Sequence, residues 1–251
     1  MVDQEFQDHF SSRSKGYASF RPRYPTALYE WLAGQCRARG TAWDCATGSG
    51  QAAIGLSPFF QRVIATDASR AQIDNATPAP NVEYRVAAAE ESGLADRSVD
   101  LVTVAQSLHW VDRDRFFAEA ARVAKPGSPL AVWMYNLMEV APAIDRVIRR
   151  LYSEVLSGFW PSDRALVDDD YRSIGFPFPE VAAPRFEMTA EWPLDHLLGY
   201  LRTWSGVIRY VSARGEDPVH AVEPELTKAW GDRGESRVVR WPLVLRVARV
   251  G

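Results

Sequence analysis

One stretch, residues 42–51, constrains the fold of this chain more than any other. It reads as a short apolar strand, then a turn that contains Gly48 and Gly50, then the first turn of a helix that runs to about Ser57. Glycine permits backbone conformations closed to other residues and lets another molecule approach the main chain closely. Free N–H groups at a helix start attract electron-rich atoms. The stretch therefore predicts a strand–turn–helix unit with a ligand at its turn.

An acidic residue follows at a spacing typical of nucleotide-binding units. Asp67 ends a second apolar run, residues 63–66, and stands 17 positions after Gly50. At this distance in a βαβ unit, an acidic side chain reaches the ribose hydroxyls of a nucleotide-like cofactor. We therefore expect the glycine turn and Asp67 to share one ligand.

The first half of the chain continues in the same alternating pattern. We expect strands at 41–46, 62–67, 82–87, 99–105 and 130–135, and helices at 25–39, 49–57, 69–75 and 112–124. Such alternation predicts an α/β fold, a doubly wound and mostly parallel sheet with helices on both faces. Ligands of these sheets bind beyond the carboxyl ends of the strands.

The second half has a different pattern. Helices are expected at 142–157 and 162–174, and from Pro193 and from Asp217, with strands at 186–192 and 238–250. Alternating apolar residues in the last strand predict an antiparallel addition to a sheet of seven strands, and Pro242 indicates an edge or a bulge. We interpret residues 1–251 as one domain, with an N-terminal lid and helix (1–40), a cofactor-binding core (41–136) and substrate-covering helices and strands (137–251).

Composition excludes several classes of function. The 251 residues are 47% hydrophobic, enough for a substantial core, and the net charge of −3 argues against a nucleic-acid surface. The sequence has no long apolar run and no leader, so we expect a cytoplasmic protein without a membrane partner. Two cysteines form no disulfide framework, and four histidines show no metal spacing. The expected partner is a small molecule, and the expected assembly is a monomer or a homodimer.

Two cofactors remain open at the glycine turn. Residues 48–53 satisfy the loose dinucleotide fingerprint, which keeps a nicotinamide oxidoreductase as an alternative. An acid inside the first strand, Asp44, argues against it, because a pyrophosphate has no use for a buried negative charge. A cofactor whose amino-acid end bears an ammonium group would use that charge. The second half also lacks the further alternating segments that a nicotinamide half-site needs.

At these residues the chain resembles the class I S-adenosylmethionine-dependent methyltransferases, which have a Rossmann-like sheet. More narrowly, it resembles the methyltransferase type 11 family and its trans-aconitate and small-carboxylate subgroup. The similar segments are residues 20–25, 44–51, 89–90, 98–102, 108–110 and 125–127, with 201–205 and 241–243 for the subgroup. Ala46 stands where many members carry a glycine, and Ala88 stands where an adenine-contacting Asp is frequent.

The resemblance implies S-adenosylmethionine as the cofactor and S-adenosylhomocysteine as the product, with no metal. The implied cofactor-binding residues are Asp44 for the amino group, Asp67 for the ribose, and Ala46, Gly48, Gly50, Ala68, Ala89, Glu90 and Gln106 around the remainder. A lid formed by the first segment would add Tyr17 and Arg21. The alternative is an arm that only packs its aromatic side chains on the domain.

The implied reaction is O-methylation of a small organic acid. Aromatic and arginine side chains that could build its acceptor pocket are Trp110, Tyr135, Trp160, Arg202, Trp204 and Arg209. Core packing is the alternative for the tryptophans, and surface exposure is the alternative for Arg202. His109 is the candidate general base, or else a structural imidazole at a strand end. Other acceptors (a ring carbon, an amine or a protein) and a non-catalytic binding module remain open.

Overall fold

A computed structural model describes residues 20–251, and Tyr17 lies outside the described residues. Its strands are β1 (Thr41–Cys45), β2 (Arg62–Asp67), β3 (Val82–Val86), β4 (Leu101–Ala105), β5 (Pro129–Tyr135), β6 (Glu180–Val181), β7 (Phe186–Trp192) and β8 (Arg237–Arg249). They form one sheet in the order β3-β2-β1-β4-β5-β8-β6, with β7 also paired to β8. β1 to β5 are parallel, and β8 runs antiparallel to β5. The expected fold class is confirmed, with eight strands instead of seven because the two-residue β6 also pairs with β8.

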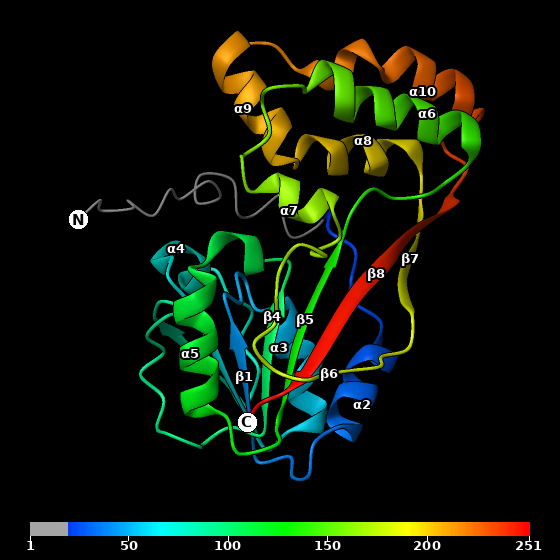
Figure 1. Cartoon of the computed structure of the whole chain (residues 1–251). Helices are drawn as coiled ribbons and strands as arrows, with labels where there is room; N and C mark the ends of the chain where they lie inside the picture. The colour runs from blue at the N-terminus through cyan, green and yellow to red at the C-terminus, as the bar shows by residue number, and fades with distance from the viewer. Residues whose placement is uncertain (1–19) are drawn as a thin grey trace.

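The helices divide into two groups. Those that accompany the parallel strands are α2 (Thr26–Gly34), α3 (Gln51–Leu56), α4 (Arg70–Asp74) and α5 (Arg113–Val123), with the short turns η3 (Ser57–Phe59) and η4 (Leu108–Trp110). The later ones are α6 (Pro142–Arg150), η5 (Leu151–Val155), α7 (Arg164–Asp168), α8 (Leu194–Arg202), α9 (Ser205–Arg214), η6 (Pro218–Ala221) and α10 (Glu223–Trp230). Figure 1 shows α6, α8, α9 and α10 as a layer, here called the cap, above the end of the sheet toward which β1 and β5 point.

Apolar side chains cover both faces of the sheet, and neighbouring residues of one strand pack on opposite faces. Ala42 packs into the cluster that contains α2 and α3, and the adjacent Trp43 packs into the cluster that contains α5. Successive side chains of a strand point to opposite faces, so one strand contributes to both cores. All seven residues of β5 are buried, as expected for a strand between β4 and β8.

The long strand β8 connects the cap to the sheet. Its C-terminal half pairs with β5 as far as Leu243, and its N-terminal half pairs with β7. Pro242 lies one residue beyond the last β5 pair, so β8 continues without the bulge that the sequence allowed. The apolar stripe of α8, including Leu197 and Leu201, is buried in the cluster that also contains Trp241. The cap and one face of the sheet therefore share one core.

Three features of the second half differ from the sequence expectation. The helix expected at 142–157 changes at Leu151 into the π-helical turn η5. The helix expected at 162–174 is only α7, because Asp170 and Tyr171 adopt left-handed backbone angles. The helix α9 was not expected, since it buries only Gly206 and Val207 and shows little apolar periodicity. Within residues 20–251, no helix has the length and apolarity that crossing a bilayer requires.

Helix α3 approaches α2 closely at Gly55. A Cβ atom at position 55 would lie 2.0 Å from the ring of the buried Tyr29. Alanine in place of a helical glycine ordinarily stabilises by about 1 kcal/mol, but overpacking costs about 1–3 kcal/mol. We expect Gly55→Ala to lower the free energy of unfolding in urea denaturation. Gly34→Ala is the matched control, because no atom lies within 4 Å of a Cβ there, and should leave stability equal or higher. Equal effects of the two substitutions would contradict this packing.

Candidate functional site

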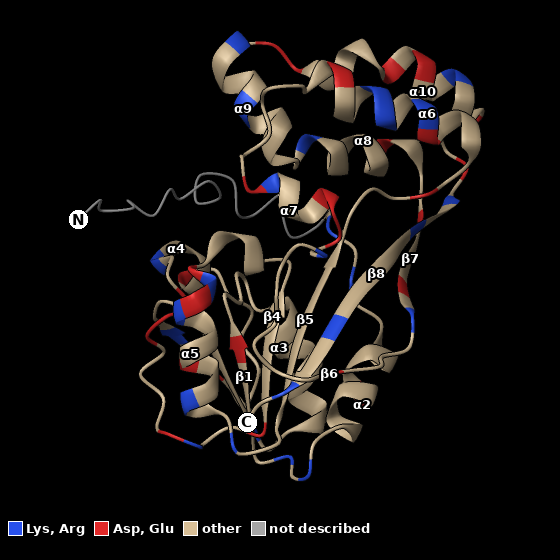
Figure 2. Ribbon diagram, viewed as in Figure 1, with Lys and Arg blue, Asp and Glu red and all other residues tan. Residues whose placement is uncertain are grey.

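Asp44 is a fully buried carboxylate in the middle of the sheet. It is the acidic residue of β1, which Figure 2 shows as a red segment within the mostly tan strands. It accepts hydrogen bonds from the hydroxyls of Thr103 (2.8 Å) and Thr47. No lysine, arginine or histidine within residues 20–251 lies at ion-pair distance from it. Burial raises its pKa to about 6, although the two hydroxyl bonds oppose the shift.

The glycine turn follows Asp44 with three left-handed residues. Ala46, Gly48 and Gly50 have φ of 52°, 57° and 91°. A Cβ at Gly50 would lie 2.2 Å from the Tyr84 hydroxyl, so the packing of β3 also requires glycine there. A Cβ at Gly48 would meet no atom closer than 3.9 Å, so the space beside Gly48 is open to another molecule. Left-handed angles at Ala46 cost about 1–2 kcal/mol, a strain that a glycine would avoid.

Asp67 ties the end of β2 to this turn. Its carboxylate accepts the backbone N–H groups of Gly48 and Ser69, both at 2.8 Å. The Thr47 N–H also donates to the Thr66 carbonyl at 2.9 Å. The negative charge of Asp67 contributes to the raised pKa of Asp44. The Asp67 carboxylate therefore holds the Gly48 backbone, and its charge reaches the buried Asp44. That the two carboxylates share one ligand stays a prediction.

The remaining cofactor candidates follow the neighbouring strands. Ala68 is exposed just beyond β2, and Ala89 is buried beyond β3. The Glu90 carboxylate accepts the Asp112 N–H at 2.7 Å. Gln106 has a φ of 60°, and its amide both donates to the Tyr135 carbonyl and accepts from the Tyr135 N–H, each at 2.9 Å. The Gln106 side chain therefore extends the β4–β5 pairing past the last strand residue.

Arg21 lies between the sheet end and the cap. It donates to the Tyr135 hydroxyl at 3.1 Å and to the Thr203 carbonyl at 3.4 Å, and it stacks over the Tyr200 ring. The sequence assigned Arg21 to the cofactor and Tyr135 to the acceptor, and the structure brings the two together. The Pro22 carbonyl accepts from Gln51 at 2.8 Å, so this segment also contacts the start of α3.

The aromatic acceptor candidates fall into two places. Trp160 and Trp204 form one cluster with Tyr152, with ring centroids 4.5–5.9 Å apart. Trp110 is 39% exposed and stacks against His109 on the β4 side. Trp204 is both buried and part of the cluster, so it contributes to core packing as well.

The two remaining arginine candidates belong to cap helices. Arg202 of α8 is ion-paired to Asp217 at 2.6 Å and to Glu223 at 3.5 Å. These contacts connect α8 to η6 and α10, and they favour a structural role for Arg202. Arg209 lies in α9 and is partly exposed.

The geometry of His109 favours the structural alternative over the general base. Its ring is buried, and Nδ1 lies 2.6 Å from the Tyr171 hydroxyl. Burial, and then the charges of Arg164 and Arg113, lower its pKa to about 3, so the ring is neutral at physiological pH. Among the described residues, no group of three or more His, Cys, Asp or Glu side chains could hold a metal ion.

Sequence reasoning missed Arg164, which lies in α7 below the cap. Its guanidinium donates to Asn136, the residue after β5, and to Tyr152. Asn136 was identifiable as a residue that follows a strand. The irregular segment around α7 offers no periodicity that would have singled out Arg164.

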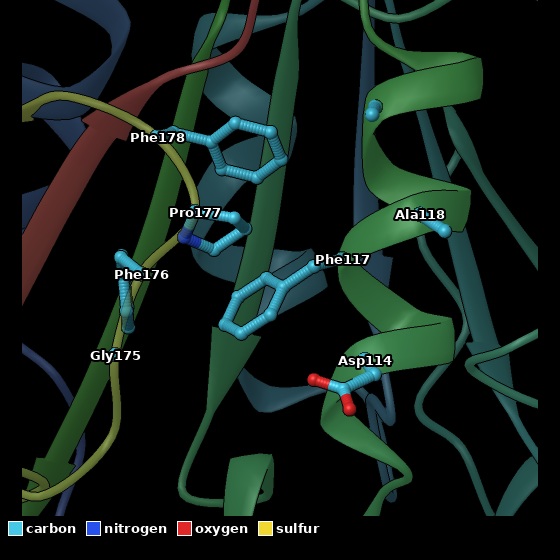
Figure 3. Close-up of a pocket in the computed structure, with 8 residues that line it drawn as sticks. Asp114, Phe117, Ala118, Gly175, Phe176, Pro177 and Phe178 are labelled. Carbon is cyan, nitrogen blue, oxygen red and sulfur yellow. The ribbon is translucent and has the colours of Figure 1, made fainter.

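An apolar groove of about 510 Å³ lies elsewhere, on the flank of α5. Figure 3 shows Phe117 of α5 facing Phe178 and Pro177 of the loop that follows α7. None of the strand-end residues described above lines it. It is therefore separate from the site around Asp44.

Comparisons with known proteins agree with this geometry. A family model described as a methyltransferase domain matches residues 43–132. A curated relative named "Putative methyltransferase", from Dictyostelium discoideum, is 33% identical over 94% of this chain and 91% of its own length. A solved structure of "a Putative Type II Methyltransferase from Anaeromyxobacter dehalogenans" is 47% identical, with a TM-score of 0.87 over 92% of this chain and 98% of that one.

A more distant solved structure, from Bacillus halodurans, shares the fold alone, with 18% identity and a TM-score of 0.50. The matched segment begins within β1 and ends within β5, and so contains Asp44, the glycine turn and Asp67. The full-length similarity extends this match through the cap. The chain belongs to the class I S-adenosylmethionine-dependent methyltransferase family.

Proposed function

We propose that this methyltransferase methylates a carboxylate of a small organic acid, as the trans-aconitate and small-carboxylate subgroup does. The segments 201–205 and 241–243 support the subgroup, and they lie in α8 and its C-terminal end and in β8. The proposed division is a lid and first helix (1–40), a cofactor-binding core (41–136) and an acceptor-covering part (137–251).

The buried carboxylate of Asp44 is the observation that carries the cofactor assignment. An unpaired buried charge is costly in a folded protein, and no cation within residues 20–251 compensates it. The ammonium group of S-adenosylmethionine has the charge that this position lacks. The open side of Gly48 fits a ligand that lies against the main chain. The residues present therefore fit this cofactor.

The other proposed cofactor contacts follow from the family resemblance. Asp67 would accept the ribose hydroxyls while it holds the turn, because a carboxylate has about four acceptor positions. Ala68 and Ala89, with Glu90, would border the adenine. Ala46, Gly50 and Gln106 would shape the remainder of the pocket, and Arg21 would close it from the side of the cap, with Tyr17 as the proposed second residue of the lid.

When bound, the cofactor supplies a methyl group that positive sulfur already activates. The main task of the chain is then alignment, which contributes about 7–11 kcal/mol when reactive geometry is enforced. Gln106 fixes the ends of β4 and β5 relative to each other through the Tyr135 backbone. A carboxylate acceptor is a nucleophile at neutral pH and needs no base. With a pKa lowered to about 3 and Nδ1 engaged by the Tyr171 hydroxyl, His109 is a weak base, which agrees with a carboxylate acceptor better than with an amine.

The first prediction concerns the pH dependence of S-adenosylhomocysteine binding. With a pKa of about 6, Asp44 is mostly ionised at pH 7 and only about one-tenth ionised at pH 5. The ligand's ammonium group stays charged over this range. We expect the wild-type affinity, measured by calorimetry, to rise about five- to tenfold from pH 5 to pH 7.

The same ionisation acts oppositely on the ligand-free fold. A carboxyl group whose pKa is raised on folding favours the folded state below its unfolded pKa, and this contribution is lost as pH rises through about 6. The ligand-free fold therefore gains no stability from Asp44 between pH 5 and pH 7, and a change in folding stability does not explain a rise in affinity for S-adenosylhomocysteine. Asp44→Asn should bind weakly with little pH dependence. A wild-type affinity that is flat from pH 5 to pH 7 would contradict the role of Asp44.

The second prediction tests the reaction. We expect turnover, followed as formation of S-adenosylhomocysteine, with a panel of small mono-, di- and tricarboxylic acids. We expect none with matched amines, phenols or a peptide mixture. Turnover of an amine or a ring-carbon acceptor, with no turnover of any carboxylic acid, would contradict the proposed carboxylate acceptor. Binding of S-adenosylhomocysteine without turnover of any acceptor would favour a binding module, and binding of NADH in its place would favour an oxidoreductase.

A further inference from the structure

Arg164 connects the end of the sheet to the helical layer above it. Figure 1 shows α7 between the cap and the end of β5. The Nη2 of Arg164 donates to the Asn136 side-chain oxygen at 2.9 Å, and its Nε donates to the Tyr152 hydroxyl at 2.7 Å. Asn136 directly follows β5, and Tyr152 belongs to η5. One guanidinium is therefore held from both sides of the interface where acceptors bind in this fold.

Two aromatic rings fix the plane of this guanidinium. Its central carbon lies 5.2 Å from the centroid of Tyr152 and 5.1 Å from the centroid of Trp160. Trp160 is in turn fixed by a bond from its indole nitrogen to the Tyr152 carbonyl, at 2.9 Å. A guanidinium with a fixed plane loses little entropy when it binds a planar anion.

The donor capacity of Arg164 is incompletely used within the described residues. Its Nη2 donates to Asn136 and its Nε donates to Tyr152. Its Nη1 has no hydrogen-bond partner within residues 20–251. The Asp168 carboxylate lies 3.4 Å from Nε, on the Tyr152 side, and is 46% exposed. Such exposed pairs neutralise little of a charge. The side chain of Arg164 is itself 21% exposed, so a ligand can reach it.

The charge of Arg164 acts on the strand ends. It helps to lower the pKa of His109, which follows β4. The arginine that the sequence favoured, Arg202, has two acidic partners and is held between cap helices. Arg164 therefore provides a positive charge, in addition to that of Arg21, that a negatively charged acceptor would meet at the ends of β4 and β5.

We propose that Arg164 is a specificity-determining residue that binds a carboxylate of the acceptor through its Nη1 edge. This inference rests on the proposed function. The carboxylate it holds is one that is not methylated, because a charge-assisted bond to the reacting oxygens would lower their nucleophilicity. The preferred acceptor then carries at least two carboxylates, one on Arg164 and one facing the methyl donor.

The test compares a polycarboxylate with a monocarboxylate in wild type and in Arg164→Gln. We use trans-aconitate and crotonate as probes and compare their kcat/KM values. Arg164→Gln should raise KM for trans-aconitate at least tenfold and remove most of the preference over crotonate, with S-adenosylhomocysteine affinity within twofold of wild type. Arg164→Lys should recover part of the preference, because it restores charge without the planar fork. Arg150→Gln is the matched control, since Arg150 is ion-paired to Glu225 in the cap.

The outcomes separate the two proposals. If wild type methylates no acid of the carboxylic-acid panel, the proposed function fails and the inference fails with it. If wild type methylates crotonate but not trans-aconitate, the inference alone is overturned. If wild type methylates trans-aconitate and Arg164→Gln keeps the same preference over crotonate, the inference alone is overturned.

A second measurement needs no variant. Phenylglyoxal modification of wild type, mapped by peptide mass spectrometry, should be slowed at Arg164 by trans-aconitate and unchanged at Arg150. Equal rates at Arg164 with and without the acid would overturn the inference.

Discussion

The structure depends on one buried carboxylate, that of Asp44, held in the centre of a parallel sheet by two threonine hydroxyls. The hydroxyl donors occupy two of its roughly four acceptor positions and bring no positive charge. A fold that only needed stability would place an apolar residue there, because a buried charge without a cationic partner is costly. The position makes sense for a protein that receives its cation from a ligand, which is how the family's cofactor meets this site in our proposal.

The surrounding architecture turns this one residue into a site. The turn after Asp44 is fixed to the end of β2 by the Asp67 carboxylate, which accepts the Gly48 N–H. Beyond β4 and β5, the amide of Gln106 continues the sheet by one more pair. The cap shares a core with the sheet through β8, so packing rather than a flexible linker holds it against the sheet. In the proposed reaction, this rigidity provides the alignment.

The sequence predicted the parallel half of the fold because its signals there are local. Apolar strands, the glycine turn and the spacing of Asp67 each lie within a few dozen residues, and the strand bounds agree within one or two residues in most cases. The cap was predicted less well. A helix such as α9, which buries two residues, has almost no apolar pattern to detect. Left-handed backbone angles at Asp170 and Tyr171 end α7 early, and no glycine in the sequence indicates them.

The candidate site could be predicted from the sequence only in part, because the partners of its side chains come from distant parts of the chain. Arg202 stands two residues before Trp204 and Arg164 stands four residues after Trp160, so sequence position alone does not separate their roles and only tertiary contacts distinguish them. Arg202 meets Asp217 and Glu223 from later elements, whereas Arg164 meets Asn136 and Tyr152 at the sheet end. Likewise, the bond between His109 and Tyr171 joins residues 62 positions apart and could not be inferred from spacing.

A crystal structure of the protein with S-adenosylhomocysteine tests the central claim most directly. We expect the ligand against the Gly48 backbone, its amino group at Asp44 directly or through one water, and its ribose hydroxyls at Asp67. A ligand bound elsewhere, or with its amino group remote from Asp44, would contradict the assignment of that buried charge to cofactor binding.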